Sequence, residues 1–239
     1  MTLRIQLIPT VLGKFWCYED TVGSALASGA WWDQQIQPFL DEADPNGWAI
    51  DLGAHIGWFT VYLARRFQGV VAVEAHPQTY WMLRRNVTMN VDGRRARLHN
   101  VGAFDRETPL TLAPAAAVGW PIPYQTTLEG CPHPASIAYQ AGLGRLGEPW
   151  IWGTPVDALV QLNQRVTLIK VDVQGCDLRA LVGLTRTIDR WRPLIVFEYE
   201  SISQLHGDTW QDYLDFFAAR TYTVERIRED LWDYVARPR

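Results

Sequence analysis

Residues 49–60 read AIDLGAHIGWFT, an apolar run that ends in an acid and continues into a turn with two glycines. The run over 48–52 is typical of a buried β-strand, and 58–67 has the apolar content of a buried helix. A glycine-containing turn between a strand and a helix usually receives a nucleotide-like cofactor. The stretch therefore predicts an α/β fold with a ligand site at this turn.

Strand and helix patterns alternate along much of the remaining chain. Further strands are expected over 70–75, 96–104, 167–173 and 193–200, and further helices over 78–91, 156–162, 177–189 and 210–217. The two segments 221–227 and 231–237 read as a closing antiparallel pair. Nearly continuous apolar strands indicate a parallel sheet covered on both faces. We expect a Rossmann-like α/β fold with a seven-stranded, mostly parallel sheet and an antiparallel C-terminal hairpin.

Two segments depart from this alternation within the single domain expected for residues 1–239. Residues 1–46 look partly helical and are expected to form an N-terminal helical cap. Residues 109–155 hold eight of the fourteen prolines and are rich in glycine and aromatic residues. Long insertions of this kind are usually lids or binding loops, although a packed surface excursion without a role is the alternative.

The composition restricts the classes of partner. The formal net charge is −4, which argues against nucleic acid or an anionic membrane as the main partner. No stretch approaches the roughly 20 apolar residues of a membrane span. Three cysteines (Cys17, Cys131 and Cys176) without metal-site spacing indicate free thiols. We expect a cytoplasmic protein, and a homodimer is left open.

The turn itself discriminates between cofactors. A dinucleotide fingerprint requires glycine at position 55, where the backbone approaches a pyrophosphate, but this chain has His55. Asp51 would repel a pyrophosphate and suits a ligand with an ammonium group. Glu74, 23 residues further on, can accept hydrogen bonds from both ribose hydroxyls. A ligand with a cation, a ribose and no phosphate is S-adenosylmethionine, although the two acids could also be merely solvated at the sheet rim.

Five segments together resemble the FkbM-type methyltransferases, within the class I S-adenosylmethionine-dependent fold. They are AIDLGAHIGWFTVYLA, VVAVEAHP, NVGAF, TLIKVDVQGCDLRALVGL and RPLIVFEYE, and the resemblance covers roughly residues 15–200. This chain departs from the family pattern at Gln174, where glutamate is usual, and at His55, where asparagine is commoner. The resemblance implies the strand order 3-2-1-4-5-7-6. It also implies methylation of an oxygen, or sometimes of another heteroatom, on a sugar or natural product.

The cofactor-binding residues follow from the turn and from the resemblance, which places 101–103 beside the adenine. They are Asp51, Gly53, Ala54, His55, Gly57, Glu74, Ala75, Gly102, Ala103 and Asp172.

Three polar residues interrupt the apolar central strands and are the catalytic candidates. Asp172 and Glu198 should end adjacent strands, where open α/β sheets bind ligands, and Lys170 should pair with them. Asp172 is expected to orient or deprotonate the acceptor, with a purely structural ionic network as the alternative. His133 and His206 are weaker candidates for a base. The two carboxylates would suit Mg²⁺, but only two convincing ligands are present, so a metal-free site is favoured.

The sequence thus predicts an S-adenosylmethionine-dependent O-methyltransferase acting on a small-molecule hydroxyl of a sugar or natural product. The alternatives are an N-methyltransferase, an NAD-dependent oxidoreductase, and a binding module that has kept the fold without activity.

Overall fold

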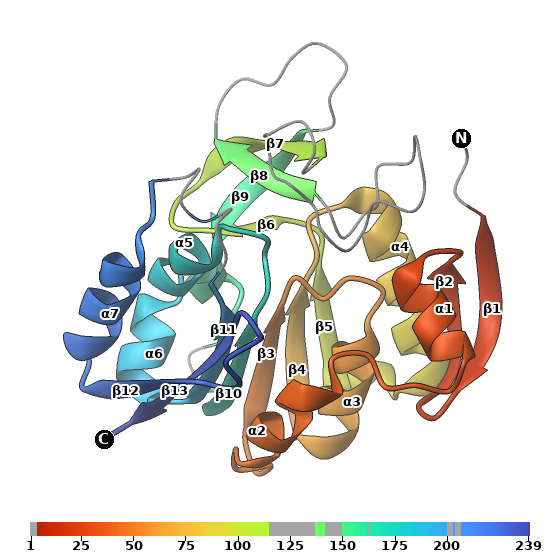
Figure 1. The fold of residues 1–239 in the computed structure, drawn as a ribbon, viewed down its shortest axis with the longest axis horizontal. Helices are drawn as coiled ribbons and strands as arrows, with labels where there is room; N and C mark the ends of the chain where they lie inside the picture. Colours follow the sequence, from red (N-terminus) through yellow and green to blue (C-terminus); the bar gives the residue numbers. More distant parts are fainter. Residues whose placement is uncertain (1–3, 115–136, 142–149, 162, 200–202, 204–206) are drawn as a thin grey trace.

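A computed structural model of the chain describes residues 4–114, 137–141, 150–161, 163–199, 203 and 207–239. Its centre is a seven-stranded sheet with the order β12-β13-β11-β10-β3-β4-β5 (Figure 1). The strands are β3 (Trp48–Leu52), β4 (Gly69–Val73), β5 (Ala96–His99), β10 (Val166–Val171), β11 (Leu194–Glu198), β12 (Tyr222–Arg226) and β13 (Asp233–Pro238). The first five run parallel, and β13 pairs antiparallel with both β11 and β12. The sheet and its C-terminal hairpin follow the predicted order.

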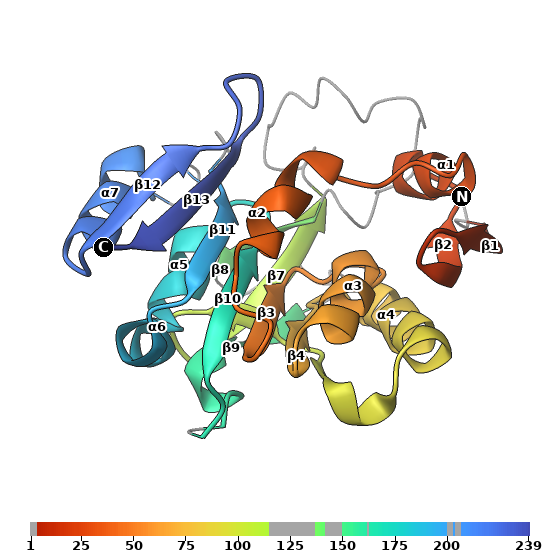
Figure 2. The same ribbon diagram turned by 90° about the horizontal axis from the view of Figure 1, so that it is seen from below.

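Alternate residues of the central strands supply two hydrophobic cores, one on each face of the sheet. Ile50 and Leu52 of β3 face one core, and Ala49 faces the other. The first core is covered by α5 (Asp177–Val182), α6 (Thr185–Trp191) and α7 (Trp210–Ala218). The second is covered by α3 (Trp58–Arg66), α4 (Pro77–Asn90) and the N-terminal segment. Figure 2 shows these two groups of helices on either side of the strands.

The predicted helix over 177–189 is two helices, because Gly183 separates α5 from α6. A side chain at this position would place its Cβ 2.0 Å from the carbonyl oxygen of Phe104. The close backbone approach therefore requires glycine, a poor helix former, at the end of α5. The short helix expected over 156–162 is a single 3-10 turn, η5 (Val156–Ala158).

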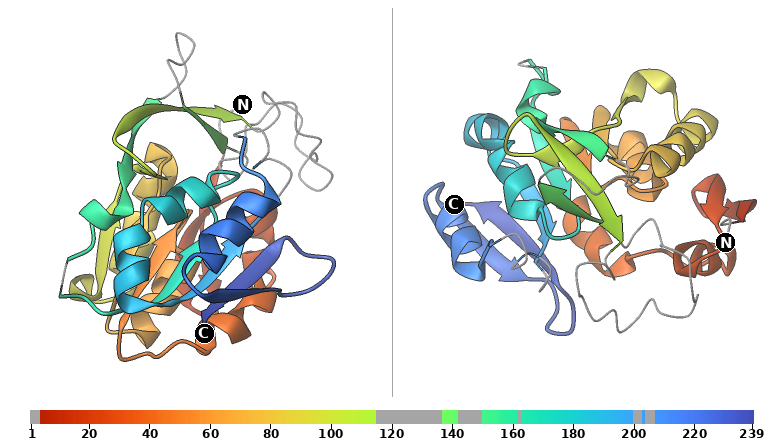
Figure 3. Two further views of the ribbon diagram at one scale, coloured as in Figure 1. Left: turned by 90° about the vertical axis from the view of Figure 1, so that its left-hand side faces the viewer. Right: turned by 90° about the horizontal axis from the view of Figure 1, so that it is seen from above.

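The single strand expected over 96–104 is also divided. Its first part is β5, while β6 (Gly102–Phe104) joins a separate four-stranded sheet of order β6-β9-β7-β8. The other strands of this sheet are β7 (Thr108–Pro114), β8 (Ile137–Ala141) and β9 (Trp150–Pro155), all within or bordering the predicted insertion. Figure 3 shows this second sheet lying across the end of the central sheet where β5 leads into β6. The prediction that the insertion forms a lid concerns mainly residues outside the described ranges.

The N-terminal segment is helical only in its second half, so the expectation of a helical cap was wrong for its first half. Residues 5–18 form an antiparallel hairpin of β1 (Ile5–Thr10) and β2 (Gly13–Tyr18). Gly13, with φ 114°, makes the turn, and alternation buries Phe15 and Cys17 while leaving Lys14 exposed. The helical part consists of α1 (Thr21–Ala27), η1 (Gln34–Ile36) and α2 (Gln37–Asp41).

Cys17 and Cys176 are buried free thiols, and Cys131 lies outside the described residues. Within the part of the chain that the structure describes, no helix has the length and apolar character needed to cross a membrane.

Candidate active site

The turn after β3 is held by backbone geometry that few residues adopt. Gly53, His55 and Gly57 all have positive φ angles of 74°, 50° and 90°. The amides of Gly53 and Ala54 both donate to the carbonyl of Val73 at 3.0 Å, which ties the turn to β4. A Cβ on Gly53 would lie 1.8 Å from the carbonyl oxygen of Asp172. The glycine therefore allows the turn to pass directly against the end of β10.

Glu74, one residue beyond β4, faces this turn. Its two carboxylate oxygens accept hydrogen bonds from the backbone amides of His55 at 2.9 Å and His76 at 2.8 Å. Burial raises the pKa of Glu74 to about 7, even though both hydrogen bonds act to lower it. The side-chain amide of Asn100 donates to the carbonyls of Glu74 and Ala75 and fixes this strand end from the other side. Glu74 thus lies beside the turn, as predicted.

Asp51 and Lys170 form the buried centre of the site. They are opposite one another in the parallel pairing of β3 and β10, and the Lys170 Nζ lies 3.9 Å from the Asp51 Oδ1. The Asp51 carboxylate is inaccessible to solvent and accepts a 2.6 Å hydrogen bond from the Thr60 hydroxyl. Burial raises the pKa of Asp51 although Lys170 and Thr60 oppose it. The Lys170 ammonium also lies 5.2 Å from the centre of the Phe59 ring.

Asp172 and Glu198 continue this network towards solvent. Lys170 Nζ lies 3.3 Å from Asp172 Oδ2, and the Gln174 side-chain amide donates to Asp172 at 3.0 Å and to Glu198 at 3.3 Å. Burial acts to raise the pKa of Asp172, but the Lys170 ammonium and the Gln174 amide outweigh it and hold the pKa below its ordinary value. Gln174 has φ 52°, so its backbone adopts the left-handed region to reach both acids.

Side chains from distant parts of the chain complete the acidic surroundings. Asp33, at the start of η1, accepts a 3.3 Å hydrogen bond from Gln35, and Asp233 is opposite Glu198 in the pairing of β11 and β13. Burial and the neighbouring carboxylates raise the pKa of Asp33 to about 6 and that of Asp233 to about 7. Sequence reasoning missed both acids, because neither interrupts an apolar strand of the parallel sheet. Asp233 could have been found only by aligning the predicted hairpin with the strand that carries Glu198.

The remaining predicted residues occupy separate positions. Gly102 and Ala103 are buried in β6, and a Cβ on Gly102 would lie 2.7 Å from Leu110. The segment that leads to them contacts Glu74 through the His99 carbonyl, which accepts from the Glu74 amide, and through the Asn100 side chain. His133 and His206 lie outside the described residues. No cluster of three or more metal-ligating side chains occurs within the described ranges.

Comparison with known proteins links this geometry to a family. The profile of the Methyltransferase FkbM domain matches residues 153–224, the segment that carries Lys170, Asp172 and Glu198. Methyltransferase 1 of Beauveria bassiana (strain ARSEF 2860) is 28% identical over 163 residues, covering 62% of this chain and 61% of that protein. Methyltransferase sdnD of Sordaria araneosa is 25% identical over 192 residues, covering 70% of this chain and 67% of that protein.

A solved structure supports the fold. The crystal structure of Methyltransferase FkbM from Methylobacillus flagellatus KT matches with a TM-score of 0.50 and 18% identity, covering 80% of this chain and 43% of that one. The chain thus spans 61% of the Beauveria relative and less than half of the Methylobacillus protein. The segment from β9 to β12 is thus similar in sequence to the Methyltransferase FkbM domain, and the α/β fold is similar to that of the Methylobacillus protein.

Proposed function

We propose that the chain is an S-adenosylmethionine-dependent methyltransferase that acts on a hydroxyl group of a small molecule, such as a sugar or natural product. The observation that carries the proposal is the continuous network Asp51–Lys170–Asp172–Gln174–Glu198, which lies directly against the Gly53 turn. The Asp51–Lys170 end of this network is buried, and its Asp172–Glu198 end is partly exposed at the ends of the strands.

The chemistry of the turn fits this cofactor. Glu74 uses one acceptor position of each oxygen for a backbone amide and retains capacity for the two hydroxyls of a ribose. The segments 49–60 and 70–77 contain no lysine or arginine that would bind a pyrophosphate. Position 55, where a dinucleotide fingerprint has glycine, carries a histidine with positive φ, so a side chain occupies the place of close backbone approach. These features favour the sulfonium cofactor over NAD.

In this proposal Glu74 binds the ribose and the turn of Gly53, Ala54, His55 and Gly57 accommodates the amino-acid portion. When bound, S-adenosylmethionine supplies an activated methyl group, so the protein needs mainly to align the acceptor and manage its proton. Asp51 has Lys170 as its nearest cation, so we assign it to fixing the network rather than to direct contact with the cofactor.

Asp172 is the residue we assign to the acceptor. Its lowered pKa keeps it ionised near neutral pH, which makes it a strong hydrogen-bond acceptor and a weak base. It is therefore suited to orient a hydroxyl group. Asp33 and Asp233, whose pKa values are about 6 and about 7, are better matched to receive a proton near neutrality.

The test is to incubate the full chain with S-adenosylmethionine and a panel of glycosides, phenols and amines, and to quantify S-adenosylhomocysteine by mass spectrometry. Turnover of hydroxyl compounds is expected. Turnover of amines alone would contradict O-methylation and assign N-methylation instead. Cofactor binding without turnover of any compound would indicate a binding module.

Calorimetric titration separates the cofactors. S-adenosylhomocysteine is expected to bind and NAD is not, and the opposite result would contradict the proposal. Asp172→Asn is expected to retain S-adenosylhomocysteine binding and to lose turnover by about a hundredfold, the usual scale for a group that acts on a proton or its acceptor. Normal turnover in this variant would leave Asp172 with a structural role only.

A further inference from the structure

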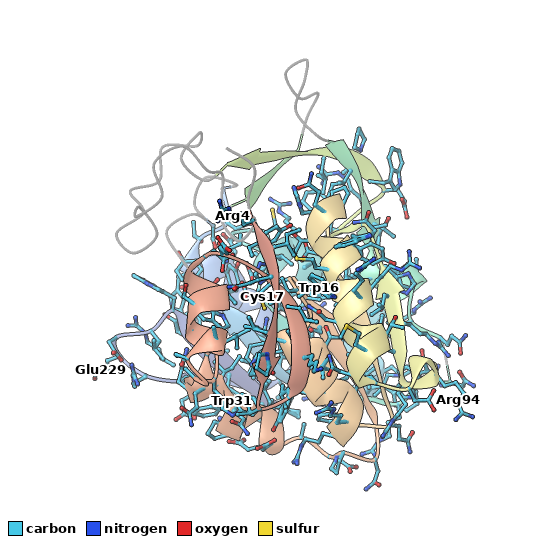
Figure 4. All side chains as sticks on the ribbon, turned by 90° about the vertical axis from the view of Figure 1, so that its right-hand side faces the viewer. Arg4, Trp16, Cys17, Trp31, Arg94 and Glu229 are labelled. Carbon is cyan, nitrogen blue, oxygen red and sulfur yellow. The ribbon has the colours of Figure 1, made fainter. Side chains whose placement is uncertain are left out.

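A hollow on the outer surface of the domain is lined by residues other than those of the candidate active site. Its volume is about 370 Å³, within the range of small-molecule pockets. It is lined by one residue of β2 and five of α4: Trp16, Trp81, Arg84, Arg85, Thr88 and Met89. Figure 4 looks onto this side of the molecule, where the N-terminal hairpin and α4 lie side by side and Trp16 is labelled.

Arg84 and Arg85 of the hollow lack an acidic partner among the residues that the structure describes. Within the described part of the chain, no carboxylate forms an ion pair with Arg84 or Arg85, although both side chains are exposed. Nearby arginines are engaged, since Arg94 pairs with Asp92 at 2.7 Å and Arg95 donates to the carbonyl of Phe67 at 2.6 Å. Two such cations side by side in a protein of net charge −4 form an unusual positive site.

Aromatic rings hold one of these cations in place. The Arg85 guanidinium carbon lies 4.2 Å from the centre of the Trp81 ring and 5.7 Å from that of Trp16. A guanidinium whose flat face contacts an indole keeps its in-plane N–H groups available for a carboxylate or phosphate. Trp81 and Met89 are about half-exposed, so apolar surface lies beside these N–H groups.

The two walls of the hollow are fixed to each other. The buried side chain of Asn86 accepts a 2.7 Å hydrogen bond from the Trp16 amide and donates to the Trp16 carbonyl at 2.9 Å. The same amide group donates to the carbonyl of Ile56 at 2.8 Å. Asn86 thus anchors β2 to α4 at the position that carries the aromatic wall, and the hollow is preformed.

We propose that this hollow is a binding site for a small anionic molecule with a planar ring. The ring would stack on the exposed indole surface, while Arg84 and Arg85 would bind a carboxylate or phosphate on it. Both interactions are needed, because an exposed arginine binds a lone anion weakly against water and salt. This site is independent of the proposed methyl transfer.

The proposal is tested by calorimetric titration of the full chain with 2-naphthyl phosphate, with inorganic phosphate and 2-naphthol as probes for the anion and the ring alone. Saturable binding is expected for 2-naphthyl phosphate, with much weaker binding of either part. Arg85→Gln is expected to reduce this affinity about tenfold, since it removes charge-assisted hydrogen bonds. Trp81→Ala is expected to reduce it several-fold through lost stacking.

Arg94→Gln is the matched control, because Arg94 is an exposed arginine close in sequence that already pairs with Asp92. It should leave the affinity unchanged. Asp172→Asn should also leave it unchanged, which distinguishes the hollow from the acceptor site. The proposal is overturned if 2-naphthyl phosphate does not bind at millimolar concentration, or if inorganic phosphate binds equally well. It is also overturned if Arg85→Gln and Trp81→Ala both bind 2-naphthyl phosphate with the affinity of the unmodified chain.

Discussion

Lys170 is the residue on which the candidate active site depends most, because it is the buried cation between two carboxylates. Only 4% of its side chain is exposed, and Asp51 is fully buried. Removing one partner of a buried ionic group leaves uncompensated charge, which typically costs about 3–5 kcal/mol. We expect Lys170→Met to lower the free energy of unfolding at pH 7.5 by about 3 kcal/mol in urea denaturation.

Arg228→Met is the control for this variant. Arg228 pairs with Asp230 at 2.5 Å on the surface, and both side chains are more than half exposed. Solvent screens such pairs, so no measurable change is expected. Similar small effects of both substitutions would show that the Lys170 network contributes little to stability.

Glu74 gives the proposed cofactor site a pH dependence. Its pKa is raised to about 7, so the carboxylate is largely ionised at pH 8 and largely protonated at pH 6. Ribose hydroxyls donate better to the ionised form. The dissociation constant for S-adenosylhomocysteine is therefore expected to rise about tenfold from pH 8 to pH 6 in calorimetry. In Glu74→Gln, binding should be weak at both pH values; an equal pH dependence in that variant would assign the effect to another group.

Single residues of the site could be predicted where they interrupt an apolar strand. Lys170, Asp172 and Glu198 were recognised in this way, and the structure brings them together through Gln174. Asp33 could not be predicted, because it precedes a short 3-10 helix far away in the sequence and reaches the site only through tertiary packing. Its role depends on neighbours that no local pattern encodes.

At the scale of elements, strands buried on both faces were the most predictable. The runs at 48–52, 70–75, 167–173 and 193–200 are predictable because a parallel central strand is apolar at nearly every position. The division of 96–104 was missed because it depends on Asn100, whose side chain bonds to the neighbouring strand end and interrupts the run between β5 and β6. The hairpin over 5–18 was missed because its alternation is weak, with Ile5 and Leu7 exposed.

The turn between β3 and α3 contacts both the end of β4, which leads to Glu74, and the end of β10, which leads to Asp172. Gly53→Ala would introduce a Cβ at a φ of 74° and 1.8 Å from the carbonyl of Asp172, so the turn or β10 must move. We expect a loss of unfolding free energy of more than about 1 kcal/mol. We also expect loss of S-adenosylhomocysteine binding.

Gly93→Ala tests whether any glycine substitution has this effect. A Cβ added at Gly93 would meet no heavy atom within 4 Å, and the residue has no positive φ, so it can accept a methyl group. The Gly93→Ala variant should keep the free energy of unfolding and the affinity for S-adenosylhomocysteine of the unmodified chain. Normal binding in Gly53→Ala would mean that the cofactor does not use this turn.

At the scale of the whole molecule, the N-terminal segment, the central sheet and the C-terminal hairpin each contribute an acid to one region. Asp33, Asp172 and Asp233 influence one another there, and Lys170 is the cation that opposes all three. Asp172 has its pKa lowered by direct contact with Lys170, whereas the pKa values of Asp33 and Asp233 are raised. The fold thus places two acids with raised pKa values, Asp33 and Asp233, near the ionised Asp172, where we propose that the acceptor binds.

This arrangement predicts how stability changes with pH. The pKa of Asp233 is about 7 in the folded chain but about 4 when unfolded, so between these values the folded chain retains a proton that the unfolded chain has released. Ionising Asp233 therefore raises the free energy of the folded state relative to the unfolded state. Its contribution to the free energy of unfolding falls as pH rises from 5 to 8. Asp233→Asn removes this cost. The stability advantage of the variant over the unmodified chain should therefore grow between pH 5 and pH 8, by on the order of 2 kcal/mol.

Urea denaturation at the two pH values measures this difference, and Asp230→Asn is the control. The Arg228 side chain lowers the pKa of Asp230, so Asp230 remains ionised throughout this pH range. Its substitution should leave the difference in stability between pH 5 and pH 8 unchanged. If Asp233→Asn also leaves it unchanged, Asp233 titrates as an ordinary surface acid. It would then be ionised at neutral pH and could not serve as a proton acceptor matched to that range, which would leave Asp33 as the remaining acid suited to that role.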